Sequence, residues 1–184
     1  MTDPLGLGRH SSDVAPTLLG AILEAPCGIG RIVEVEAYGG ADDPASHAFR
    51  GATPRSQIMF GPAGRLYVYL IYGMHHCANV VTGADGDGQA VLIRGIEPLV
   101  GIEAMRNNRP KARRDRDLAN GPGKLCAALG IGRAHDGLDL LDTASSVRLR
   151  PGEPVDPDLV VTSSRIGISV AQEFPWRWYV RGYA

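Results

Sequence analysis

Apolar and polar positions alternate over short distances along the 184-residue chain, and this pattern predicts many short elements rather than a few long ones. Apolar residues at helical spacing predict three helices, over residues 11–24, 98–107 and 120–129. Ser11 or Ser12 can cap the first helix, and Pro98 can open the second because proline is tolerated in a first turn. The chain thus offers only short helices.

Period-two alternation or short apolar runs predict strands over residues 31–38, 66–72, 77–81, 89–95, 138–141, 146–149, 160–168 and 176–180. Short turns at residues 73–76 and 83–88 join three of these strands, which favours an antiparallel meander. We therefore predict an α+β fold with an antiparallel or mixed sheet, in a single domain over residues 1–184. The long turn-rich segment 39–62 is typical of a functional or mobile loop.

The composition fits a globular protein with many turns, because 44% of the residues are hydrophobic and the chain has 24 glycines and 13 prolines. Three cysteines without a CxxC pair predict no disulfide framework and a reducing compartment. Neither a signal-peptide core in residues 1–9 nor an apolar run of membrane-spanning length is present in the sequence. We expect a cytoplasmic protein with no membrane partner.

The charge is nearly balanced, at a net −1, which argues weakly against a general nucleic-acid binder. Its distribution matters more, because residues 106–116 hold six basic residues and one acidic residue. This basic segment can be read as a solvated loop or as a phosphate-contacting loop, and the sequence leaves both interpretations open.

The strand over residues 31–38 carries the first candidate chemistry. Val33, Val35 and Ala37 share the face expected to meet the core, so Glu34 and Glu36 share the other. Two carboxylates about 7 Å apart along a strand can divide into acid and base roles, and this separation is near that of glycosidase pairs. Alternating glutamates are also common on solvated strands, so spacing alone leaves both readings open.

Two further groups invite chemical interpretations. His75, His76 and Cys77 look like metal ligands, but neighbours on a strand point oppositely and no paired ligand motif accompanies them, so we expect no metal site. Tyrosines 67, 69 and 72 are core or sheet-face aromatics by default. Tyr72 and Met74 flank a glycine at a predicted turn, where they could instead form a wedge between stacked bases.

Many segments together resemble the alkyladenine (3-methyladenine) DNA glycosylase family, in matching order and spacing over most of residues 18–181. The matching motifs are IVEVEAY at 32–38, DPASH at 43–47, TPR at 53–55, MF at 59–60, LYVYLIYGM at 66–74, CAN at 77–79, VLIR at 91–94, EP at 97–98, GPGKLC at 121–126, RIGI at 165–168 and WRWYVR at 176–181.

The resemblance implies hydrolysis of the N-glycosidic bond of damaged purines in duplex DNA, after the nucleotide has been rotated out of the stack. Glu36 matches the carboxylate that activates the attacking water, and Arg94 matches a residue that positions this water. Glu34 is then a supporting residue. The family's substrates are alkylated or deaminated purines of the 3-methyladenine, 7-methylguanine, hypoxanthine and ethenoadenine class.

The same resemblance implies a base pocket, a DNA-contacting surface and a mixed fold with a curved antiparallel sheet, peripheral helices and a protruding DNA-inserting hairpin. The residues that match the pocket are Tyr38, His47, Tyr69 and Asn79, with Ala90 and Leu92 on the strand face of Arg94. The residues expected to touch DNA are Tyr72, Met74, Thr53, Arg55 and Lys124. Asn79 would exclude guanine by crowding its exocyclic amine.

The resemblance further implies a monofunctional enzyme with no cofactor, acting as a monomer on damaged double-stranded DNA in the cytoplasm, associated with the bacterial nucleoid. Two other functions stay open from the residues alone: a sugar hydrolase that uses Glu34 and Glu36 as its pair, and a DNA-binding protein without catalysis. His75 departs from the aromatic residue that relatives often carry in the hairpin. Residues 140–157 show little that matches, and their role stays open.

Overall fold

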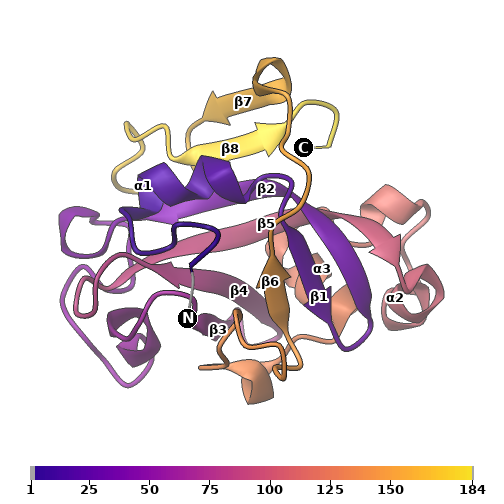
Figure 1. Ribbon diagram of the computed structural model, residues 1–184, viewed down its shortest axis with the longest axis horizontal. Coiled ribbons are helices and arrows are strands. Elements are labelled where there is room, and N and C mark those ends of the chain that lie inside the picture. The colour runs from indigo at the N-terminus through magenta and orange to yellow at the C-terminus, as the bar shows by residue number, and fades with distance from the viewer. Residues whose placement is uncertain (1–2, 184) are drawn as a thin grey trace.

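The computed structural model of the protein describes residues 3–183, and a single antiparallel sheet organises them (Figure 1). The strands are β1 Ile22–Ala25, β2 Gly28–Tyr38, β3 Leu66–Ile71, β4 His75–Thr82, β5 Gln89–Val100, β6 Arg148–Arg150, β7 Val160–Ser163 and β8 Arg177–Val180. Their order is β3-β4-β5-β2-β1-β6, and β8 pairs with both β2 and β7. In Figure 1 the β7–β8 hairpin lies beyond β2, far from β3.

The helices are short and lie around this sheet (Figure 1). They are α1 Ser11–Val14, α2 Ile102–Asn108 and α3 Pro122–Leu129, with 3-10 turns η1 Ala15–Leu18, η2 Gly40–Asp42, η3 Gln57–Phe60, η4 Asp115–Asp117, η5 Arg133–His135 and η6 Pro157–Leu159. An antiparallel sheet with peripheral helices confirms the predicted α+β class.

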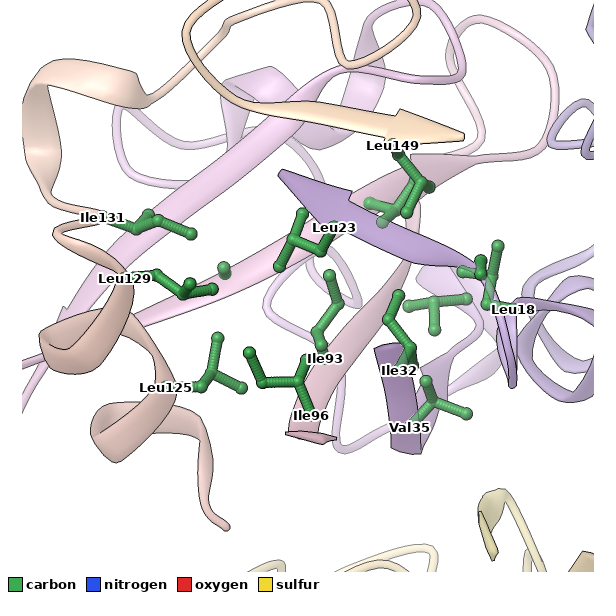
Figure 2. Packing of buried hydrophobic residues seen from close by; sticks show 14 of the residues in the cluster. Leu18, Leu23, Ile32, Val35, Ile93, Ile96, Leu125, Leu129, Ile131 and Leu149 are labelled. Carbon is green, nitrogen blue, oxygen red and sulfur yellow. The ribbon is translucent and has the colours of Figure 1, made fainter. Parts of the chain in front are cut away.

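The hydrophobic core lies between the sheet and α3. Figure 2 shows Leu125 and Leu129 of α3 facing Leu23 of β1 and Ile93 and Ile96 of β5. All five side chains are buried. Burying a leucine or isoleucine side chain stabilises the folded state by roughly 1.5–3 kcal/mol, so this cluster fixes the sheet on which the site is built.

The central strands β2 and β5 are longer than predicted and pair irregularly around Glu34. Simple alternation would place Ile32 on the face of the two glutamates. The register shifts between Ile32 and Val35 break that alternation, and Ile32 joins Val33, Val35 and Ala37 in the core cluster. The irregularity therefore lets Ile32 pack in the core beside Val33, while Glu34 and Glu36 lie outside this cluster.

The predicted meander is confirmed, because β3, β4 and β5 are neighbours in chain order. The β3–β4 hairpin turns at Tyr72, Gly73 and Met74, and β4 begins at His75, inside the turn predicted over residues 73–76, rather than at Cys77. Tyr72 has a positive φ of 53°, which is rare for a residue with a side chain. Tyr72 and Met74 are 83% and 70% exposed at this tip.

The helix predicted over residues 11–24 was wrong beyond Leu18. His10, rather than a serine, accepts the capping hydrogen bond, and the helical turns α1 and η1 end at Leu18. Gly20 then has a φ of +88°, and residues 22–25 turn into β1, which pairs with β2. The apolar residues that suggested one helix belong to two elements, the α1–η1 turns and β1, which pack into the same core.

The helix predicted from Pro98 was also wrong at its start, because Pro98 lies in β5 opposite Gly30, and α2 begins at Ile102 after Gly101. The strand predicted over residues 138–141 is a turn with one isolated bridge, between Asp139 and Arg65. The strand predicted over residues 160–168 ends at Ser163.

Three absences apply to residues 3–183. No helix there has the length and apolar character needed to cross a membrane. No three His, Cys, Asp or Glu side chains in that range converge as metal ligands would. The thiols of Cys27, Cys77 and Cys126 are free.

Candidate active site

A cavity of about 330 Å³ opens where β2, β3, β4 and β5 approach the loop after β7. This volume lies at the lower end of the roughly 300–1,000 Å³ range of small-molecule pockets. Its lining is Tyr38, Ala45, His47, Met59, Tyr67, Tyr69, Ile71, Tyr72, Cys77, Asn79, Ala90, Leu92, Arg94, Pro122, Ile166, Gly167 and Ile168. Eight of the residues expected in the site from the sequence are therefore brought together around one space.

Glu36 lies directly behind this lining and is fully buried. Its Oε2 accepts a hydrogen bond from the Tyr38 hydroxyl at 3.0 Å and lies 3.2 Å from Arg94 Nη1, and its Oε1 accepts one from the Ile166 amide at 2.7 Å. Burial raises the pKa of Glu36, while Arg94, the Ile166 amide and Tyr38 oppose that rise without cancelling it. A buried carboxylate with a raised pKa is suited to accept a proton.

Glu34 holds Arg94 in place. Both Arg94 Nε and Arg177 Nε donate to Glu34 Oε1, at 3.0 and 2.7 Å. Burial alone would lower the pKa of Arg94, but Glu36 and Glu34 raise it, so the guanidinium stays charged. The side chains of Glu36, Arg94, Glu34 and Arg177 thus form a chain of contacts in which carboxylates and guanidiniums alternate. The two glutamates are linked through Arg94, which does not match the sequence alternative of a solvated strand face.

Aromatic rings form two sides of the cavity. Tyr38 comes from the end of β2, whereas Tyr69 comes from β3 and packs edge-on against His47, with ring centroids 4.6 Å apart. Burial and then the nearby Arg55 charge lower the pKa of His47, so its imidazole is neutral at pH 7. Burial also raises the pKa of Tyr38 and Tyr69 far above pH 7, and all three rings are uncharged there.

Asn79, Ala90 and Leu92 form the buried part of the lining, from β4 and β5. Asn79 donates its side-chain amide to the Tyr67 carbonyl at 3.0 Å and to the Cys77 carbonyl at 3.4 Å. Two acceptors on neighbouring strands therefore fix the orientation of this side chain.

The expected DNA-contacting residues lie outside the cavity, except Tyr72, which reaches its lining from the hairpin tip. Met74 lies near Tyr72 on the same tip without lining the cavity. Thr53, Arg55 and Lys124 are exposed and each has an intramolecular partner: Ser56 Oγ at 2.9 Å, the Leu70 carbonyl at 3.1 Å and Asn120 Oδ1 at 2.9 Å, respectively.

The basic segment 106–116 is partly neutralised by its surroundings. Arg106 pairs with Asp115 at 2.5 Å, and Arg114 binds Asp117 through two nitrogens. These contacts reduce the positive field that the sequence alone indicated. None of its residues lines the cavity.

Sequence reasoning missed several residues of the site. Ile166 and Ile168 line the cavity, and Arg177 binds Glu34. The RIGI and WRWYVR motifs contain all three, so the signal was present, but strand alternation offers no means of bringing residues 166–177 to a glutamate at position 34 or 36. Met59, Tyr67 and Cys77 are further lining residues inside matched motifs.

A buried acid beside a cavity lined by aromatic rings is suited to an enzyme that takes a flipped base into a pocket. Comparison with known proteins agrees, because residues 7–184 match the family described as "Methylpurine-DNA glycosylase (MPG)". The chain belongs to this family. It is accordingly a DNA N-glycosylase that acts on alkylated purines in DNA repair.

Individual relatives extend over most of the chain. A protein of Burkholderia lata named "Putative 3-methyladenine DNA glycosylase" is 53% identical over 175 residues, which cover 95% of this chain and 84% of that protein. Proteins of the same name from Nitrosospira multiformis and Methanoculleus marisnigri are 49% and 47% identical, and the alignments cover 99% and 95% of this chain and 92% of each relative.

Proposed function

We propose that the protein releases alkylated and deaminated purines, of the 3-methyladenine, 7-methylguanine, hypoxanthine and ethenoadenine class, from double-stranded DNA by hydrolysis after nucleotide flipping. It acts as a monomer and leaves an abasic site without cutting the strand. The observation that carries this proposal is the placement of Glu36, buried and bound by Tyr38 and Arg94, which both line the cavity.

In this mechanism Glu36 takes a proton from the water that attacks C1′ of the sugar. The bond from C1′ to the purine nitrogen breaks, and its electrons leave with the base. The Glu36 charge also stabilises the positive charge that grows on the sugar. Because Oε2 already faces Tyr38 and Arg94, the water reaches it as one of these groups shifts, and Arg94 then orients the water.

The rings determine which bases enter. Tyr38 stacks on one face of the flipped base, and His47 and Tyr69 contact the other face. A neutral His47 avoids repelling a cationic alkylated purine, and aromatic faces attract such a cation. Ala90 and Leu92 complete the slot, and the fixed Asn79 side chain clashes with the exocyclic amine of guanine.

The hairpin and the exposed cations hold the DNA. Tyr72 fills the gap left by the flipped nucleotide, with Met74 next to it. Thr53, Arg55 and Lys124 contact the backbone, and Lys124 lies at the start of α3, where free N–H groups also favour phosphate. No residue needs a metal or cofactor to carry out these roles. A purine alkylated at N3 or N7 is cationic and leaves readily, whereas a neutral base such as hypoxanthine must gain a proton as it leaves.

The decisive experiment compares Glu36→Gln with the wild type on a duplex that contains one 7-methylguanine or one hypoxanthine. We expect Glu36→Gln to lower base release by about 10²- to 10⁴-fold, the usual contribution of a general base, and to leave duplex binding largely intact. Glu97→Gln, which changes a glutamate paired with Arg31 outside the cavity, is the matched control.

The pH profile adds an independent check. Since the reaction needs ionised Glu36 and burial raises its pKa, release should fall as the pH drops through a value above the ordinary glutamate pKa of about 4.3. Normal turnover by Glu36→Gln would show that another group is the base. Lesion binding without release, even at enzyme excess, would instead favour a binding protein, and cleavage of oligosaccharides a sugar hydrolase.

A further inference from the structure

A fully buried ion pair lies behind the cavity. Arg165 binds both carboxylate oxygens of Asp43, with Nη1 2.5 Å from Oδ2 and Nη2 2.8 Å from Oδ1. Among the ion pairs of residues 3–183, this is the one in which both side chains are completely excluded from solvent. Neither residue lines the cavity, and neither was expected in the site from the sequence.

Arg165 also joins the segments that carry the acid and one of the rings. Its guanidinium lies over the Tyr38 ring, with Cζ 4.9 Å from the centroid, and donates to the Ala37 carbonyl at 3.0 Å. On its other side it lies 5.3 Å from the Trp176 ring centroid and donates to the Ala171 carbonyl. The end of β2 is thereby tied to the segment between β7 and β8.

Asp43 anchors the loop that leads to His47. Its carboxylate accepts the Gly39 amide and the Ala45 amide, both at 3.1 Å. Ala45 lines the cavity, and His47 follows two residues later. One carboxylate thus fixes the start of the loop and the part of it that enters the site.

The residue after Arg165 donates to the proposed base, since the Ile166 amide lies 2.7 Å from Glu36 Oε1. An amide on a loop keeps such a contact only if the loop is held in place. A buried ion pair is often no more stabilising than apolar residues of the same size, so overall stability does not account for this arrangement. Its specific consequence is the position of the Ile166 amide and of Tyr38.

We propose that the Arg165–Asp43 pair is a positioning device for catalysis, which holds the Ile166 amide on Glu36 and Tyr38 against the cavity. This inference rests on the proposed function of Glu36. Arg165 and Asp43 touch neither the base nor the water, and they act through Ile166, Tyr38 and the loop that carries His47.

The test uses Arg165→Lys, which keeps the charge but cannot bind both carboxylate oxygens, and Asp43→Asn, which keeps the shape. Base release from a 7-methylguanine duplex is measured in single turnover at saturating enzyme, and binding is measured on a duplex with an abasic-site analogue. We expect maximal rates to fall by about 10- to 100-fold, as for small misplacements of catalytic groups, with binding changed less than about 3-fold. Arg31→Lys, at the partly exposed Arg31–Glu97 pair outside the cavity, is the control.

A pH profile separates positioning from general weakening. The groups that face Glu36 are Arg94, Tyr38, Glu34 and the Ile166 amide. Losing the amide hydrogen bond removes one influence that lowers the pKa of Glu36, so the acid limb should move to higher pH in both variants. Ile166→Pro, which deletes the amide donor and keeps the Arg165 and Asp43 side chains, should reproduce this shift.

The outcomes are distinct. If the wild type releases no base, the proposed function fails. If the wild type is active and folded Arg165→Lys keeps its rate and pH profile, the positioning role is overturned. Where Arg165→Lys or Asp43→Asn is unfolded by circular dichroism, Ile166→Pro decides, because an unchanged acid limb in that variant removes the link to Glu36.

Discussion

At the scale of single residues, the site depends on how burial and neighbouring charges set protonation states. Glu36 is a carboxylate whose pKa is raised by burial, and His47 is an imidazole whose pKa is lowered by burial and by Arg55. Both shifts favour the neutral form of the group in a low-dielectric setting. The raised pKa makes Glu36 a better proton acceptor. The lowered pKa of His47 removes a positive charge from the place where a cationic base would enter.

The His47 shift can be measured directly. We expect its imidazole to titrate below about 6.5, the ordinary histidine value, in an NMR titration of the free protein. Arg55→Gln should move this pKa upward, because it removes the charge that disfavours the imidazolium. Lys124→Gln, which removes a different exposed cation, should leave it unchanged, and an unshifted pKa in Arg55→Gln would show that burial alone acts.

Asn79 offers a test of selection against normal guanine. Its side chain is held by the Tyr67 and Cys77 carbonyls and cannot move aside for an exocyclic amine. We predict that Asn79→Ala raises release of undamaged guanine from a G·T mismatch by roughly 10- to 200-fold, the range for one steric element.

The matched control for Asn79→Ala is Asn108→Ala, which removes another amide that donates to a carbonyl, here that of Ala128, outside the cavity. Release of 7-methylguanine should stay near the wild-type rate in both proteins. Equal guanine release by Asn79→Ala and the wild type would assign the selection to another residue.

At the scale of elements, the β3–β4 hairpin carries its aromatic tip in a strained conformation. Tyr72 has a φ of +53° and is 83% exposed, so neither packing nor an easy backbone geometry explains the ring there. The left-handed conformation costs roughly 1–2 kcal/mol for a residue with a Cβ. Strain of this kind is found at functional positions.

Tyr72→Gly therefore separates stability from function. We expect this variant to be as stable as the wild type or more stable by about 1 kcal/mol in urea unfolding, because glycine adopts a positive φ freely. Base release should nevertheless decrease, since the side chain that we propose to hold the nucleotide out of the stack is missing. Tyr72→Phe keeps the ring and should behave as the wild type, and full activity of Tyr72→Gly would remove the wedge role.

The elements also show what the sequence can and cannot predict. Periodicity located β2 to β5 because alternation and short turns are local. Periodicity failed over residues 11–24, because Gly20 separates a helical turn from a strand and both pack against the same core. It also failed at Pro98, which lies in β5 rather than at the start of a helix. The approach of residues 165–177 to Glu34 and Glu36 depends on the pairing of β8 with β2, which no local pattern encodes.

For the same reason the motifs supplied the list of site residues but not their connections. Glu36 could be named from its motif, whereas its bond to the Ile166 amide and the burial of Arg165 against Asp43 required the folded chain. Local spacing fixes which side chains share a strand face, and tertiary pairing fixes which of them are buried together.

At the scale of the whole molecule, the net charge of −1 means that DNA affinity must come from a few local cations. Arg106 and Arg114 of the basic segment are paired with aspartates, and Arg55 and Lys124 are the cations that we expect to contact phosphate beside the cavity. Each phosphate contact contributes about −0.9 to the slope of log K against log salt.

We thus predict that Arg55→Gln and Lys124→Gln each reduce the magnitude of this slope by about 1 and weaken binding equally for damaged and undamaged duplexes. Fluorescence anisotropy over a range of NaCl concentrations measures both effects. Arg106→Gln should have the same slope as the wild type within error. If this variant changed the slope as much as Arg55→Gln does, the basic segment would be part of the DNA contact.

The pre-formed shape of the β3–β4 tip has a consequence for how damage is found. A tip that is already folded can test each step of a double helix without rearranging, so the opening of the duplex sets the pace of the search. Weakly stacked or mispaired positions would then be sampled most often, before any chemical recognition of the lesion. Abundant mismatches should slow the clearance of damage by occupying the enzyme.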